Sequence, residues 1–145
     1  MKRNPIAIGG LFAAILLYSG AVRADPGALP PVQHSGDISY LSGGIGLDES
    51  EAIRAAAPAY ALSLSFISTI DGHGTYNAPD QLTILRADGS PVLDLKPDGP
   101  FVLIDLPPGK YRISAGSASL SKTQAVQIAR GGHKKLVFEL PESGQ

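Results

Sequence analysis

The stretch FVLIDLPPGKYRI, residues 101–113, gives the clearest indication of the fold. Its first six residues, 101–106, are almost continuously apolar, which predicts a central strand covered on both faces. Pro107-Pro108-Gly109 then suits a tight turn, because proline fixes one φ angle and glycine takes the next. We therefore expect the chain to reverse here and Tyr111 to return to the core.

Strand patterns continue on both sides of this stretch, from residue 60 to residue 140. Over residues 60–66, apolar side chains alternate with Ala and Ser, the pattern of a strand with one buried and one solvent-facing side. Ala87-Asp88-Gly89-Ser90 separates two further runs and suits a hairpin turn. The remaining predicted strands cover 81–86, 91–95, 111–115, 123–129 and 134–140.

The spacing of these runs predicts the fold class. They follow one another every ~8 to 14 residues with no helical pattern between them, which favours an all-β domain over residues 60–140. We expect about seven antiparallel strands packed as a sandwich or barrel, followed by a disordered tail at 141–145. The predicted core consists of large side chains that recur along the strands: Leu62, Leu64, Phe66, Leu82, Ile84, Leu93, Phe101, Leu103, Tyr111, Ile113, Val126, Ile128, Leu136 and Phe138.

Two segments precede the predicted sandwich. Residues 25–37 are rich in proline and glycine and lack apolar periodicity, so we expect a flexible leader. Residues 38–59 are predicted to form a short strand and one short helix. Asp48 and Glu51 have the spacing of a capping box at the start of this helix, and Pro58 would end it.

Residues 1–24 have the pattern of a cleavable signal peptide. A cationic start is followed by an apolar run over 6–18 and by Val22-Arg23-Ala24, which predicts cleavage between Ala24 and Asp25. The run of about 13 residues is shorter than the ~20 that span a bilayer, so an uncleaved anchor is the weaker alternative. We expect a periplasmic or secreted protein with no stable membrane span after cleavage.

Charge and cysteine content narrow the classes of partner. The chain has 12 basic and 13 acidic residues and no cysteine. Cleavage would remove three basic and no acidic residues, leaving a net charge of −4. An acidic domain argues against nucleic acid or anionic lipid as a partner, since both are bound through an excess of basic side chains. Without disulfides, stability must come from the apolar core.

The order of turns over residues 81–140 resembles that of the carboxypeptidase regulatory-like domains. It runs strand, Asp88-Gly89, strand, Asp98-Gly99-Pro100-Phe101, and then LPPGKYRI at residues 106–113. These domains are similar in fold to prealbumin (transthyretin) and belong among the immunoglobulin-like sandwiches. The resemblance therefore implies an immunoglobulin/prealbumin-like sandwich. One departure is Ser117-Ala118-Ser119-Leu120, which stands where such domains often carry a glycine–aromatic pair.

A second segment adds to the resemblance. Residues 40–51, YLSGGIGLDESE, look like a segment of small exported proteins of Gram-negative bacteria that carry this same domain. The resemblance implies a periplasmic location.

Several groups of polar residues have the composition of a functional site. Asp71, His73 and Asp80 lie within ten residues of one another and could hold a metal ion or position a base, although they also suit turns around their glycines. Asp48 and Glu49, with Glu51, form the densest acidic patch, which suits either a cation or the start of a helix.

Basic and aromatic side chains suggest contact surfaces instead. A basic group, formed by Lys122, Arg130, His133, Lys134 and Lys135, could bind an acidic partner or anionic glycan, or could keep a sheet edge solvated. We single out Tyr40, Asp48, Glu49, His73 and Tyr76 as a candidate contact patch, because exposed aromatic side chains often mark binding surfaces.

The sequence contains no catalytic, cofactor or metal motif, so no such residue is assigned and no cofactor is expected. The leading hypothesis is a non-catalytic periplasmic binding or accessory module for an envelope protein, peptide or glycan. The alternatives are a small hydrolase or metal-binding protein that uses the loop with Asp71, His73 and Asp80, and a purely structural envelope protein. The pattern leaves the oligomeric state open.

Overall fold

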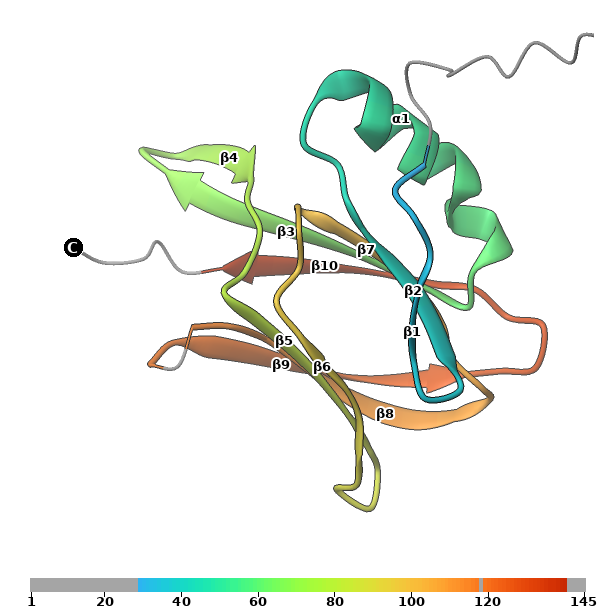
Figure 1. Cartoon of the computed structure of the whole chain (residues 1–145). Helices are drawn as coiled ribbons and strands as arrows, with labels where there is room; N and C mark the ends of the chain where they lie inside the picture. The colour runs from blue at the N-terminus through green and yellow to red at the C-terminus, as the bar shows by residue number, and fades with distance from the viewer. Residues whose placement is uncertain (1–28, 118, 141–145) are drawn as a thin grey trace, which may run out of the picture.

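The computed structural model describes residues 29–117 and 119–140, which form two β-sheets and one short helix (Figure 1). This confirms the predicted all-β class. The predicted signal peptide, its cleavage between Ala24 and Asp25, and the predicted tail at 141–145 lie outside the described residues. Within the described part of the chain, no helix is long and apolar enough to cross a membrane.

The first sheet has six strands and the second has four. The first has the order β1-β2-β7-β3-β10, with β4 also paired to β3, and the second has the order β6-β5-β8-β9. The strands are β1 (Gln33–Ser35), β2 (Ile38–Gly43), β3 (Leu62–Ile70), β4 (His73–Tyr76), β5 (Gln81–Arg86), β6 (Pro91–Leu95), β7 (Phe101–Asp105), β8 (Gly109–Gly116), β9 (Ser121–Ile128) and β10 (Lys134–Leu140).

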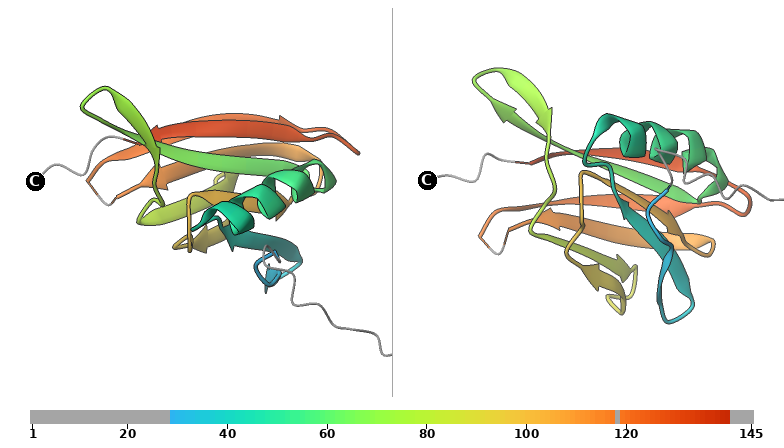
Figure 2. Two further views of the ribbon diagram at one scale, coloured as in Figure 1. Left: turned by 90° about the horizontal axis from the view of Figure 1, so that it is seen from above. Right: turned by 45° about the horizontal axis from the view of Figure 1, so that its top comes forward.

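The molecule has three layers. The two sheets face each other, and helix α1 (Leu47–Ala56), extended by the 3-10 turn η1 (Ala57–Ala59), lies on the outer face of the first sheet (Figure 2). The helix covers the part of the sheet formed by β2 and β7, where Leu41, Phe101 and Leu103 pack against Ile53. The helix does not extend over the outer face of β3 and β10, which lies next to it.

Strand β7 is covered on both faces, as its nearly continuous apolar sequence predicted. It pairs with β2 on one side and with β3 on the other. Val102 and Ile104 face the core between the sheets, whereas Phe101 and Leu103 face the helix. Two separate cores therefore meet at one strand.

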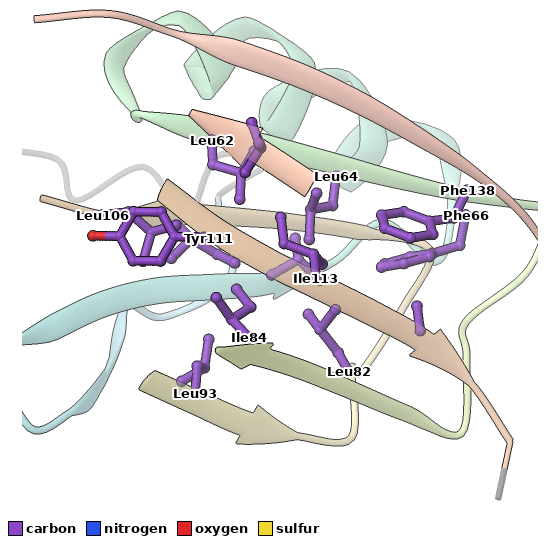
Figure 3. Close-up of a cluster of buried hydrophobic side chains, with 14 of the residues drawn as sticks. Leu62, Leu64, Phe66, Leu82, Ile84, Leu93, Leu106, Tyr111, Ile113 and Phe138 are labelled. Atoms are coloured by element: carbon purple, nitrogen blue, oxygen red, sulfur yellow. The ribbon is translucent and has the colours of Figure 1, made fainter. Parts of the chain in front are cut away.

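The core between the sheets contains most of the predicted residues (Figure 3). The Phe66 and Phe138 rings lie 5.6 Å apart in this core and are tilted by 32°, a centroid distance within the range of favourable aromatic pairs. Tyr111 is buried, as predicted, and its hydroxyl donates a hydrogen bond of 2.6 Å to the carbonyl of Pro107. Leu136 was predicted to be buried but is only half-buried.

The N-terminal segments belong to the sheet rather than preceding it. Strand β2 is inserted beside β7, and β1, within the predicted leader, pairs with β2 through a turn at Gly36, where φ is +58°. Two polar contacts explain a strand without apolar periodicity: Ser39 hydroxyl to His34 Nδ1 at 3.0 Å, and Tyr40 hydroxyl to Gln33 at 3.3 Å. With β4, which was predicted as loop, the described residues form ten strands rather than about seven.

The pairing of β3 with β10 is parallel, although all strands were predicted to be antiparallel. Strand β10 follows β9 of the second sheet and crosses to the edge of the first, where it lies alongside β3. Parallel neighbours require such a crossover between distant parts of the chain, which local turn patterns do not reveal.

The predicted capping box is absent from the described helix start. Helix α1 begins at Leu47 after Gly46, and no side chain caps it. Glu49 instead accepts a hydrogen bond of 2.7 Å from the amide of Gly44, and Ser50 bonds to the carbonyl of Leu47. Asp48 is exposed in the first turn, where a carboxylate still favours the positive end of the helix dipole.

Candidate functional site

A groove of about 320 Å³ lies on the outer face of the first sheet, beside the helix. We call it the α1 groove. Its walls are α1 with the following turn on one side and β10 on the other, and β4 closes one end. The outward side chains of β3 form its floor. This position follows from the layers, because the short helix packs over β2 and β7 and does not extend across β3 and β10.

The floor of the α1 groove is polar, although it is buried. Ser63 is 6% exposed and Ser65 is 8% exposed, and both line the groove. They were predicted to face solvent, because they alternate with the buried leucines of β3. In the structure they lie at the bottom of the groove instead, flanked by α1 on one side and by the Lys135 and Val137 side chains of β10 on the other. Ile67 continues the floor toward β4, where it pairs with Tyr76.

Aromatic rings and one arginine form the end of the groove near β4. The rings of Tyr76 and Phe101 lie 4.9 Å apart and are tilted by 46°. The guanidinium carbon of Arg54 lies 5.4 Å from the Phe101 ring centre and 5.6 Å from that of Tyr76. This stack holds the guanidinium through cation–π attraction and leaves its planar edge available to an acceptor.

A glycine makes room for the Phe101 ring. Gly44 has a φ of +99°, and a Cβ atom built there would lie 2.2 Å from a carbon of the ring. The Gly44 amide is held by Glu49 from the first turn of α1. The loop before the helix thus fixes the position of the ring in the groove wall.

The opposite end of the groove is basic. Lys135 on β10 lies beside Ser63 in the sheet register, and His133 precedes the same strand. The Nδ1 atom of His133 lies 2.6 Å from the Tyr60 carbonyl. A carbonyl can only accept, so Nδ1 carries the proton and Nε2 is the ring nitrogen left to meet a ligand. Among the described residues that line the groove there is no Asp or Glu.

Of the predicted contact patch, only Tyr76 lines the α1 groove. It is 49% exposed. Tyr40 is half-buried in β2, Glu49 holds the glycine loop, Asp48 lies on the surface of α1, and His73 lies exposed at the start of β4. The structure therefore places one of the five residues in the α1 groove.

The loop residues Asp71, His73 and Asp80 are exposed. Asp71 and His73 belong to the tight hairpin between β3 and β4, where Asp71 has a φ of +50°, whereas Asp80 precedes β5. Across residues 29–117 and 119–140, no three His, Cys, Asp or Glu side chains lie close enough to hold a metal ion. Turn formation accounts for Asp71.

Most groove residues were missed by sequence reasoning. Ser63 and Ser65 resemble an ordinary solvent-facing row, and Phe101 was assigned to the core between the sheets. One sequence feature could have drawn attention to Arg54, because it is the only basic side chain in α1. Of the predicted basic group, His133 and Lys135 line the groove.

A larger hollow of about 500 Å³ lies among the loops near Pro108 and Gly131. Its lining includes Asp37, Asp105 and Arg130, so charges of both signs face a mostly polar surface. Compared with this hollow, the α1 groove has a more apolar and aromatic surface, and its described charged residues are all basic. A mostly apolar surface with a few placed polar groups is typical of ligand sites.

No protein-family model matches the chain, and comparison with curated proteins finds no significantly similar sequence.

Proposed function

We propose that this protein is an exported, non-catalytic binding module that holds part of an envelope partner in the α1 groove. The observation that carries the proposal is the stack of Arg54 on Tyr76 and Phe101 beside a hollow whose described lining includes no acidic side chain. Tyrosine and arginine contribute most strongly to protein interfaces, because they combine apolar area with directed hydrogen bonds.

The groove supports binding rather than catalysis. Its polar side chains are two serines, an arginine, a lysine and a histidine, together with the Tyr76 hydroxyl. The described contacts of His133 are to a backbone carbonyl and not to a serine, so the geometry assembles no nucleophile and base pair. These groups can still orient a ligand through hydrogen bonds and charge.

We also propose that the fold belongs with the carboxypeptidase regulatory-like, prealbumin-like sandwiches. Two features support this. The two facing sheets supply the architecture, and the Tyr111 hydroxyl bonds to a carbonyl four residues upstream. A tyrosine whose hydroxyl donates a hydrogen bond to the backbone a few residues upstream recurs in immunoglobulin-like sandwiches.

Export to the periplasm is the remaining part of the proposal. Sequencing the N-terminus of protein recovered from the periplasm should give Asp25 as the first residue, because Ala24 ends the signal pattern. Recovery only from the cytosol, with Met1 retained, would remove this part while leaving the groove untouched.

The binding function can be tested with two matched variants. Ser65→Phe fills the α1 groove without entering the core between the sheets, whereas Ser114→Phe places the same ring on the outer face of β8 in the second sheet. Both should retain the wild-type circular dichroism spectrum. Wild type and Ser114→Phe, immobilised as bait in periplasmic extract, should recover the same partner, and Ser65→Phe should not. Equal recovery by all three forms would refute a role for the groove.

A further inference from the structure

We infer that the α1 groove binds the C-terminal end of an extended polypeptide, with the free carboxylate at Lys135 and apolar side chains toward Tyr76. This inference rests on the proposed binding function and names the chemistry of the ligand. It is carried by the polarity of the groove, the spacing of its floor and its volume.

The two ends of the groove differ in chemistry. At one end Ser63 lies between Leu103 and Lys135 in the sheet register, and His133 is nearby in the lining. At the other end Ile67 pairs with Tyr76, and the Arg54 guanidinium lies over the Tyr76 and Phe101 rings. A ligand that suits both ends must be anionic at Lys135 and must offer an apolar body with a hydrogen-bond acceptor near Arg54.

The floor of the groove favours a peptide as that ligand. Ser63 and Ser65 are two residues apart on one strand, so their hydroxyls recur about every 6.6 Å. An extended peptide presents backbone polar groups to one side with the same period. A hydrocarbon chain would cover these hydroxyls without bonding to them, at a cost in free energy.

The length of the groove limits the bound segment to the last few residues of the peptide. From Ser63 to Ile67 the floor is four strand steps, or about 13 Å, which accommodates roughly four extended residues. The volume of about 320 Å³ lies at the lower end for ligand sites. A chain continuing past the basic end would place a neutral amide, and not an anion, beside Lys135.

The charge distribution of the groove also favours an anionic ligand. The groove is locally basic on a chain whose formal net charge is −1. An ammonium group beside a hydroxyl suits a carboxylate, because charge-assisted hydrogen bonds are stronger than neutral ones. Arg54, stacked on the rings at the aromatic end, can donate to a backbone carbonyl of the bound peptide.

The inference can be tested by NMR titration of the purified exported protein with three probes. These are acetylated Leu-Ala-Leu-Ala with a free carboxylate, the same peptide as its C-terminal amide, and decanoate. We expect the acid to shift the backbone amide signals of Ser63, Ser65 and Val137, and to bind roughly tenfold more tightly than the amide, as for one exposed charge-assisted bond. Decanoate should bind more weakly than the acid peptide.

Two lysine variants separate the local contact from overall charge. Lys135→Gln should remove the difference in affinity between acid and amide, whereas Lys122→Gln, at an exposed position of β9, should retain it. Equal affinity of wild type for acid and amide, absence of binding by both peptides, or tighter binding of decanoate would each overturn the inference. If the titration fails but Ser65→Phe still loses the partner in the pull-down, the peptide inference is wrong and the proposed binding function stands. If the titration fails and the pull-down does not depend on residue 65, both proposals are wrong.

Discussion

Replacing Gly44 by alanine should destabilise the protein by two additive effects. A residue with a Cβ atom at φ +99° carries backbone strain of about 1–3 kcal/mol. The new methyl group would also lie 2.2 Å from the Phe101 ring. That ring is only 5% exposed, so it cannot swing freely into solvent, and overpacking of this kind costs about 1–3 kcal/mol more.

A matched glycine isolates the second effect. Gly89, in the hairpin turn between β5 and β6, has a similar φ of +89°, but a Cβ atom there would meet nothing within 4 Å. Urea denaturation of the two alanine variants should therefore show the backbone cost in both and the clash only in Gly44→Ala. The expected difference in unfolding free energy is about 1–3 kcal/mol.

The clash can also be relieved. In a Phe101→Leu background, the loss caused by Gly44→Ala should fall toward that of Gly89→Ala, because the two neighbouring changes are not additive. Equal destabilisation by Gly44→Ala and Gly89→Ala, or a loss unaffected by Phe101→Leu, would refute the assignment of Gly44 as the residue that makes room for the ring.

Three other predictions concern the sheets and one turn. Tyr111→Phe should lower the unfolding free energy by about 1 kcal/mol in urea denaturation, because it removes the bond to Pro107; an unchanged midpoint would contradict a structural role for the hydroxyl. Phe138→Ala should cost about 3–5 kcal/mol in the same assay, since it leaves a cavity in the core, and a loss below 1 kcal/mol would show that the ring is not tightly packed. Bonds from the Ser90 hydroxyl at 2.6 Å and the Ser90 amide at 2.8 Å hold the pKa of Asp88 below its ordinary value, so its stabilising effect should be lost as pH falls through that lowered pKa. NMR titration should show a higher Asp88 pKa in Ser90→Ala, and an identical pKa in both forms would disprove this cause.

Local sequence patterns were sufficient to predict much of the second sheet. Strands β5 and β6 have the predicted bounds, because a turn with glycine at positive φ separates two short apolar runs. The double coverage of β7 was also predicted from its continuous apolar sequence. These features depend on neighbouring residues, which the sequence displays directly.

The groove could not be predicted in the same way. It depends on pairs such as Ser63 with Lys135, which are far apart in the chain and adjacent only because β3 and β10 pair in parallel. Ser63 and Ser65 therefore resembled a solvent-facing row. Tyr76 was identified as an exposed aromatic residue, but its neighbours Arg54 and Phe101 were not, because the position of the helix over the sheet was unknown.

The parallel pairing of β3 with β10 also determines when the protein can fold. The first sheet needs residues 134–140 to lie alongside residues 62–68, so a growing chain cannot complete that sheet until residues 134–140 have left the ribosome. Folding that awaits such distant contacts is slow. Delayed folding keeps a nascent polypeptide extended, and it would therefore favour the export proposed above, because a translocation channel admits an unfolded chain more readily than a compact one.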